Sequence, residues 1–347
     1  MQRRGLSHTW RWRGGSVKRV GRGLDAVIAR EDDKEANSRA IGEAAMCPQV
    51  VGIGCTVLDY LGIVSRMPQF DDAQAVEVQR WAVSGGGPVS TALVTLARLG
   101  TSVAYVGLLG DDAAGRQIRH EFEREGVDVS RIRHESTVRS PTVMVLVEAG
   151  TGRRAFVAFR EPALEFALAP EDIAMITSAR FLHLDGWHPN VALEAARLAK
   201  KSGVRVSLDA YRLDERTAEW VRAADVLIAT ESFPRRYTGE GDLRKASDLL
   251  LDQGPSLVVT TLSERGCYVA TRESQFLAPG FTVDVVDTTG AGDAFHGAFL
   301  HGLLQGWDLA QTARFANAVG ALACRRLGGR SSLPSLTEVT DFLNSSS

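Results

Sequence analysis

Short apolar runs alternate with longer amphipathic segments over the second half of the chain. Apolar runs with little polar alternation are typical of strands that are buried on both faces of a sheet. Their regular alternation with helices predicts a parallel sheet that is covered by helices on both faces. The expected strands are 180–184, 204–208, 224–228 and 256–261, and the expected helices are 190–202, 214–222 and 243–252. The pattern therefore predicts an α/β fold of three layers.

The first half of the chain interrupts this alternation twice. After an apolar strand at 50–55, the pattern of residues 58–83 predicts two strands around a turn. Three further β-like runs follow later, at 129–134, 141–148 and 153–160. Because polar and apolar residues alternate here, each strand is expected to have one solvated face. We expect the two stretches to pair as a small sheet outside the main body.

One stretch near the C-terminus combines a strand, a glycine turn and the start of a helix. A strand at 282–286 is expected to lead into Gly290-Ala291-Gly292, and a helix is expected from Asp293 to about Gln305. The two glycines let the backbone turn without a Cβ penalty, so that successive N–H groups can point into one concavity. The helix start adds unpaired donors and the positive end of its dipole. The pattern predicts an anion-binding cradle with the carboxylate of Asp293 at its mouth.

Further polar residues fall where the predicted strands end. In sheets of this type, ligands bind beyond the carboxyl ends of the strands. Asp59 follows the first strand, and three consecutive glycines, 85–87, stand where a strand meets the helix expected at 89–99. The other strand-end residues are Asp185, Asp209, Glu231 and Thr261. We expect these side chains to lie along one edge of the sheet.

Composition narrows the class of partner. The chain has 347 residues and a net charge of −2, which argues against binding to nucleic acid or to an anionic membrane surface. No apolar run has the length of a transmembrane helix. The four cysteines show no CxxC spacing, so we expect reduced thiols and not a metal cluster. The Gly-x-Gly at 52–54 lacks the third glycine and the following helix of a dinucleotide fold. A soluble, cytoplasmic protein is expected.

The first 45 residues differ from the rest of the chain. They carry 10 basic and 6 acidic residues, or +4, so the remainder sums to −6 because the whole chain is −2. No apolar segment of a secretion signal accompanies the basic start. Hydrophobic periodicity begins only after Met46. We expect either a disordered extension at 1–45 or a start of translation at Met46, followed by one domain at 46–347.

Two motifs resemble signatures of the PfkB (ribokinase-like) carbohydrate kinases. The C-terminal signature is similar to Val286-Asp-Thr-Thr-Gly-Ala-Gly-Asp-Ala-Phe295, and the N-terminal one to the segment from Gly85-Gly-Gly-Pro to Ala97-Arg-Leu-Gly100. Val106-Gly-Leu-Leu-Gly-Asp-Asp-Ala-Ala-Gly115 and Gly126-Val-Asp-Val-Ser130 also match in order and spacing. The likeness covers about residues 48–344. The Gly-Gly-Gly-Pro start, His296 and the ending at Arg330 look most similar to the sulfofructose kinase and ketohexokinase branch.

The resemblance implies a three-layer α/β/α ribokinase-like fold and a small β-sheet lid, built here from about 58–83 and 130–163. The lid often forms a homodimer contact in this family. The activity implied is transfer of the γ-phosphoryl group of ATP to a hydroxyl of a ketose or furanose-type sugar. Asp293 would be the base that deprotonates that hydroxyl, and Gly290, Ala291 and Gly292 would hold the phosphoryl oxygens. Asp59, Gly85 and Gly86 correspond to the sugar-binding acid and glycines of the family.

The resemblance also implies the nucleotide and cation sites. ATP would lie over Thr261, Ser263, Gly266 and Asn317, with its phosphates bridged by Mg²⁺. Thr230-Glu-Ser-Phe233 stands where many members carry Asn-x-x-Glu, which makes Glu231 the candidate nucleotide-side acid. A monovalent cation such as K⁺ would bind near Asp287, Thr289, Gly328 and Ser332.

Two departures and two alternatives qualify this interpretation. Ser90 stands where the family has a sugar-binding Asn, and a hydroxyl offers one donor where the amide offers two. Arg160 is the candidate cation for a charged substituent of the acceptor. The aromatic residues Trp81, Phe159 and Trp187 near the lid suit a nucleoside kinase of the same fold. A catalytically idle, ligand-binding relative is the other alternative, although the predicted cradle and base are both intact.

Overall fold

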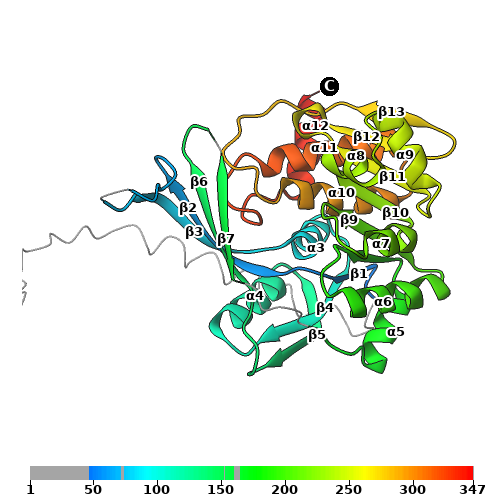
Figure 1. Ribbon diagram of the computed structural model, residues 1–347, viewed down its shortest axis with the longest axis horizontal. Coiled ribbons are helices and arrows are strands. Elements are labelled where there is room, and N and C mark those ends of the chain that lie inside the picture. Colours follow the sequence, from blue (N-terminus) through cyan, green and yellow to red (C-terminus); the bar gives the residue numbers. More distant parts are fainter. Residues whose placement is uncertain (1–46, 72–73, 152, 160–164, 347) are drawn as a thin grey trace, which may run out of the picture. The chain divides into compact units, whose positions relative to one another are not determined.

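The computed structural model describes residues 47–71, 74–151, 153–159 and 165–346. The predicted extension at 1–45 and the candidate Arg160 lie outside these residues. Figure 1 shows a large central sheet with helices packed on it and a smaller sheet to one side. Among the described residues, no helix is both long enough and apolar enough to cross a membrane.

The larger sheet has nine strands in the order β13-β12-β11-β10-β9-β8-β1-β4-β5. The strands from β11 to β5 pair in parallel, whereas β12 and β13 are antiparallel additions at one edge. This arrangement confirms the predicted, mostly parallel sheet. The strands are β1 (Val50–Ile53), β4 (Val103–Gly110), β5 (Val127–Glu135), β8 (Phe181–Leu184), β9 (Arg205–Ala210), β10 (Val226–Thr230), β11 (Leu257–Thr261), β12 (Cys267–Ala270) and β13 (Gln275–Ala278).

Helices cover both faces of this sheet, and each face has its own apolar core. One core joins the sheet to α3 (Pro88–Arg98), α4 (Ala113–Arg124), α10 (Ala291–Gln305), α11 (Leu309–Ala323) and α12 (Leu336–Ser345). The other joins it to α5 (Pro170–Ser178), α6 (Pro189–Lys201), α7 (Thr217–Ala223), α8 (Ser232–Thr238) and α9 (Leu243–Leu251). Because apolar side chains of both sheet faces are removed from water, the strands need no polar face. The three-layer α/β/α fold is therefore confirmed.

The second sheet has four strands in the order β3-β2-β6-β7. They are β2 (Val57–Val64), β3 (Val78–Gly86), β6 (Thr142–Glu148) and β7 (Arg154–Phe159). Its inner face carries Leu61, Val143, Val145 and Val147, which form a small core with Leu327. Apart from the run at 129–134, the two stretches that interrupt the main alternation form one sheet, as predicted.

Three local predictions were wrong or incomplete. The run at 129–134 belongs to β5 in the main sheet, because Val127, Val129 and Ile132 pack into the core under α4 and pair with β4. The expected strand at 282–286 does not form, since no strand lies beside it and the amides of Val286 and Asp287 donate to the carbonyl of Cys324 at 2.8 and 3.2 Å. Helices α5 and α8 were not predicted.

Candidate active site

The glycine turn ahead of α10 forms an open cradle of backbone donors. Gly290, the N-cap of the helix, has φ 76°, and a Cβ there would lie 2.8 Å from the Cα of Gly329. Both facts require glycine at this position. The amides of Gly292 and Asp293 lie in the first turn, where the helix itself offers no acceptor. A Cβ built on Gly292 would meet nothing within 4 Å, so there is free space next to these donors.

Asp293 stands in the first turn of α10, half-buried beside this cradle. Burial, and after it the charge of Asp185, raise the pKa of its carboxyl from 3.8 to about 6. The charges of Arg330 and Arg154 oppose this rise. A carboxyl with such a pKa is mostly ionised at neutral pH and is more basic than an ordinary aspartate. Asp293 is therefore suited to accept a proton.

Two more buried carboxyls lie at the ends of adjacent strands behind Asp293. Asp185 follows β8 and accepts hydrogen bonds from the amides of Cys55 (2.8 Å), Trp187 (3.0 Å) and Val89 (3.4 Å), so it joins its own loop to two other segments. Burial raises the pKa of Asp185 to about 6. Burial and the charges of Asp293 and Asp185 raise the pKa of Asp209 well above its ordinary value. Both carboxyls therefore release their protons at a higher pH than an exposed aspartate.

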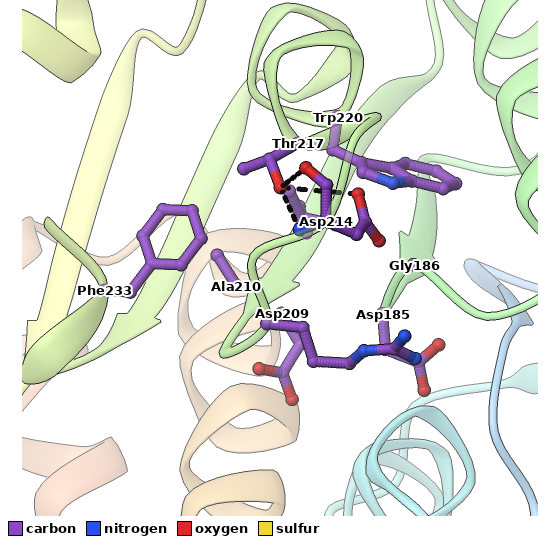
Figure 2. A pocket seen from close by; sticks show the side chains of 10 residues that line it. Asp185, Gly186, Asp209, Ala210, Asp214, Thr217, Trp220 and Phe233 are labelled. Carbon is purple, nitrogen blue, oxygen red and sulfur yellow. Dashed lines mark hydrogen bonds between the residues drawn. The ribbon is translucent and has the colours of Figure 1, made fainter. Parts of the chain in front are cut away.

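Asp185 and Asp209 also line a small pocket between the strand ends and α7. Figure 2 shows them on the side of this pocket opposite Thr217 and Trp220. The pocket has room for about 20 Å³, the size of a single water molecule. His296, one turn after Asp293 on α10, places Nε2 3.5 Å from Asp209 Oδ1. A continuous group of titratable side chains therefore extends from the cradle into the sheet edge.

The predicted glycine floor is packed against charged side chains. Asp59 is 6% exposed and projects from β2, and a Cβ on Gly86 would overlap its Oδ2 atom. A Cβ on Gly85 would overlap Nη1 of Arg330 in the same way. A larger residue at either position would displace the side chain that approaches the backbone there. Asp59, Gly85 and Gly86 are brought together as expected.

Ser90 has a different place from the one expected. Its side chain has no exposed surface and donates its hydroxyl hydrogen to the carbonyl oxygen of Gly86 at 2.6 Å. A hydroxyl has only one hydrogen to donate. Ser90 therefore holds the floor in shape and has no hydrogen left to donate to a ligand. The predicted contact with the sugar stays a prediction, in which the hydroxyl oxygen would accept.

The residues predicted for the nucleotide gather at the other end of the sheet edge. Thr261 ends β11, and Ser263 begins the short 3₁₀ helix η1 (Ser263–Arg265) that leads to Gly266. Asn317 of α11 donates to the carbonyl oxygens of Ala278 (3.1 Å) and Pro279 (3.0 Å), beside the β12–β13 edge. These residues form one cluster. Glu231 is exposed after β10 and pairs with Arg265, so its carboxylate is partly neutralised.

The predicted cation residues also come together. Asp287 is 1% exposed and accepts hydrogen bonds from the amide and the hydroxyl of Thr289 (2.9 and 2.7 Å) and from the amide of Gly328 (3.0 Å). Ser332 donates to the carbonyl oxygen of Gly328 at 2.7 Å. Among the described residues, no basic side chain forms an ion pair with Asp287. A buried carboxylate of this kind fits a monovalent cation as its counter-ion.

Two arginines near the cradle were not predicted. Arg154 reaches from β7 and donates from Nη1 to the hydroxyl of Thr289 at 3.2 Å. Arg330 is 3% exposed and donates from Nη2 to the carbonyl oxygen of Gly86 at 3.0 Å. The only sign in the sequence that a side chain lies close to the backbone is a pair of glycines, and this pair does not identify the residue that packs against it. Only the chain's path in space brings these cations to the site.

The three aromatic residues that suggested a nucleoside pocket are divided between the two faces of the second sheet. Strand register places Trp81 and Phe159 on the same face as the exposed Tyr60, opposite Asp59. Trp81 is 74% exposed there. Trp187 packs against the inner face. Since two of the three side chains lie away from the cradle, this support for a nucleoside pocket is lost.

Comparisons with known proteins agree with this geometry. Residues 48–336 match the family described as pfkB family carbohydrate kinase. The ATP-dependent ribose-1-phosphate kinase of Halopiger xanaduensis is 32% identical over 81% of this chain and 93% of its own length. The ribokinase of Haemophilus influenzae is 28% identical over 76% of this chain and 89% of its own.

A solved structure gives the same result for the fold. A putative ribokinase from Agrobacterium tumefaciens superimposes with a TM-score of 0.79 and 25% identity, over 86% of this chain and 98% of that one. The family match spans both sheets and the cradle. The chain belongs to the pfkB family of carbohydrate kinases and is a phosphotransferase with an alcohol group as acceptor.

Proposed function

We propose that this kinase transfers the γ-phosphoryl group of ATP to a hydroxyl of a furanose-type or ketose sugar. The observation that carries the proposal is Asp293, a carboxyl of raised pKa beside an open cradle of amide donors. Phosphoryl transfer requires little covalent chemistry from the protein beyond positioning and charge stabilisation. The names of the ribose-1-phosphate kinase and ribokinase relatives support ATP and a five-carbon acceptor.

The acceptor would lie between Asp59 and Asp293, above the glycines at 85 and 86. The carboxylate of Asp59 would accept hydrogen bonds from sugar hydroxyls, while Asp293 removes the proton from the attacking hydroxyl. The amides of Gly292 and Asp293 would donate to the phosphoryl oxygens on which charge develops. The base and the donors stand next to each other because both belong to the first turn of α10.

ATP would extend from the cradle toward the cluster of Thr261, Ser263, Gly266 and Asn317. The hydrogen bonds of Asn317 to the carbonyls of residues 278 and 279 would keep this end of the site in place. Mg²⁺ bound to the phosphates would supply further charge neutralisation. A monovalent cation such as K⁺ beside Asp287 would compensate that buried charge and steady the turn at Thr289.

The second sheet would act as a lid. Its inner face carries Asp59, and Arg154 on the same sheet reaches the cradle turn at Thr289. Such a cover would exclude water, which would otherwise compete with the sugar for the phosphoryl group. On the outer face, exposed Tyr60, Val83, Met144 and Val157 form one row across all four strands. An apolar row of this kind is typical of an interface, and we propose that it joins two copies of the chain.

A phosphoryl-transfer screen over ketoses, aldopentoses, sugar acids, sulfosugars and nucleosides tests the proposal. We expect turnover with a ketose or furanose-type sugar and none with water alone above background. Asp293→Asn should lower kcat by about 10²–10⁴-fold, because it removes the base, while nucleotide binding measured by calorimetry stays the same. Near-normal turnover in this variant would show that Asp293 is not the base. Turnover with nucleosides alone would contradict the proposed acceptor.

A further inference from the structure

The loop at 328–332 lies between the two halves of the site. On one side it is fixed to the cradle: the amide of Gly328 donates to Asp287 at 3.0 Å, and Gly329 packs against Gly290, whose Cβ would lie only 2.8 Å away. No larger residue fits at Gly290 without moving this contact. The position of the loop and the position of the cradle turn therefore depend on each other.

The next residue, Arg330, points to the other half of the site. Its Nη2 donates to the carbonyl oxygen of Gly86 at 3.0 Å, and its guanidinium lies 4.9 Å from the ring centroid of Phe122. Nη1 lies 3.8 Å from Glu121 Oε2, and this same oxygen accepts the amide of Gly85 at 2.5 Å. Arg330 and Glu121 thus hold two consecutive glycines of the floor, one by its carbonyl and one by its amide.

The burial of Arg330 requires an explanation. It is 3% exposed, and neither Nε nor Nη1 forms a hydrogen bond within the described part of the chain. Burying a guanidinium with incomplete partners is unfavourable, and an apolar side chain is often better for stability. Its charge lowers the pKa of Asp293, and the charge of Asp59 in turn favours the guanidinium. Arg330 therefore interacts with the acids of both half-sites, which a purely structural arginine need not do.

We propose that Arg330 is a positioning residue that couples the phosphate cradle to the acceptor floor. A phosphate that binds the amides at 290–293 holds the turn against Gly329, and the short loop transmits this restraint to Arg330 and hence to Gly85 and Gly86. Nucleotide binding then orders the floor before the sugar arrives. By reciprocity, a bound sugar strengthens nucleotide binding. This inference rests on the proposed function, because it requires a nucleotide phosphate in the cradle.

The test uses the nucleotide alone and does not depend on which sugar is the acceptor. Hydrogen exchange of the segment 84–90 is measured by mass spectrometry with and without the magnesium complex of AMP-PNP, a nucleotide that cannot transfer its terminal phosphoryl group. In the wild type we expect the nucleotide to slow exchange of this segment by about fivefold, the lower end of typical coupling between sites. Arg330→Met and Arg330→Lys should abolish this protection while the Kd for the nucleotide changes by less than about threefold.

Arg98 provides a matched control. Its Nη1 donates to the carbonyl oxygen of Leu333, at the end of the same loop, at 2.5 Å, and it pairs with Glu125 at 2.7 Å. It therefore anchors the loop from outside and does not contact the glycine floor. Arg98→Met should lower the melting temperature but keep the protection of 84–90. Loss of protection in Arg98→Met to the same extent would mean that any loosening of the loop has this effect, which overturns the specific role of Arg330.

Other outcomes are equally decisive. If Arg330→Met fails to fold, the test uses Arg330→Lys and Glu121→Gln, and both should lower the protection of 84–90. Glu121→Gln is suitable because it keeps an acceptor for the amide of Gly85 and removes the charge that faces Nη1 of Arg330. Unchanged protection in these variants overturns the inference and leaves the kinase proposal intact. The inference is also overturned, and the kinase proposal again left intact, if the wild type binds the nucleotide and residues 84–90 are not protected from exchange. A wild type that binds no nucleotide contradicts the proposed function and the inference together.

Discussion

The pKa of Asp293 determines how turnover should depend on pH. Burial raises this pKa from 3.8 to about 6, and the base acts only when it is ionised. With a pKa of about 6, about nine-tenths of the carboxyl is ionised at pH 7 and about one-tenth at pH 5, so kcat/KM should fall about tenfold between these values. An ordinary aspartate would lose less than about a tenth of its activity over the same range.

The charges around Asp293 predict the direction in which variants move this acid limb. Asp185 raises the pKa of Asp293, so Asp185→Asn should shift the limb to lower pH. Arg154 lowers it, so Arg154→Met should shift the limb to higher pH. Arg330 acts in the same direction as Arg154, and Asp209 interacts with the same carboxyl. A general loss of stability would not readily shift the acid limb in opposite directions in two single variants.

The assay is the pH dependence of kcat/KM from pH 4.8 to 8, with the acceptor found in the screen and with saturating MgATP. Thermal unfolding at each pH checks that the enzyme stays folded over the range. Asp293→Asn provides the background rate. A fall in wild-type kcat/KM of less than about twofold between pH 7 and pH 4.8 would refute the reasoning, because it would mean that the base is not desolvated. Shifts of Asp185→Asn and Arg154→Met in the same direction would refute the electrostatic explanation.

Three further predictions follow from single contacts. Gly290→Ala should destabilise the fold by about 1–2 kcal/mol or more in chemical denaturation, because an alanine at φ 76° is strained. Gly292→Ala should leave the stability equal or up to about 1 kcal/mol higher, yet it should lower kcat because its methyl group fills the cradle. Full activity in Gly292→Ala would contradict the placement of the phosphoryl group. Asp209→Asn should stabilise the fold increasingly as the pH rises above 4, by up to about 1.4 kcal/mol per pH unit, because the buried acid holds a proton that the unfolded chain releases. A gain in the free energy of unfolding that does not change between pH 4.5 and 7.5 would contradict this. Trp81→Glu on the exposed face of the second sheet should convert a dimer into a monomer in light scattering, and an unchanged mass would exclude this face as the interface.

The sequence alone determined the fold class and the order of its layers. Apolar runs at 204–208 and 224–228, alternating with amphipathic helices, leave only a covered parallel sheet as a way to remove both strand faces from water. The glycine turn and Asp293 could also be recognised from the sequence, because their chemistry is local: a positive φ, free amides and a carboxylate occur within four consecutive residues. For the same reason the local motif was sufficient to identify the family.

Strand pairing was the first thing that local pattern could not decide. The runs at 129–134 and 141–148 look alike, yet the first joins the main sheet and the second joins the second sheet. The difference is which core removes their apolar side chains from water, and this depends on residues far away in the chain. The segment at 282–286 likewise has a β-like composition but no neighbouring strand to pair with.

The positions of the charged groups were decided only by the tertiary structure. Arg330 lies 244 residues beyond the carbonyl that it holds, and no periodicity or spacing relates two such positions. Ser90 is in the right place along the chain, but its hydrogen is already used by Gly86. The pKa of Asp293 is raised by burial and by the charge of Asp185, and the charges of Arg330 and Arg154 oppose this rise; these residues come from three other parts of the chain. The sequence therefore identified Asp293 as the candidate base. Folding determined its basicity and its partners, because long-range electrostatics depend on distances that only the folded chain defines.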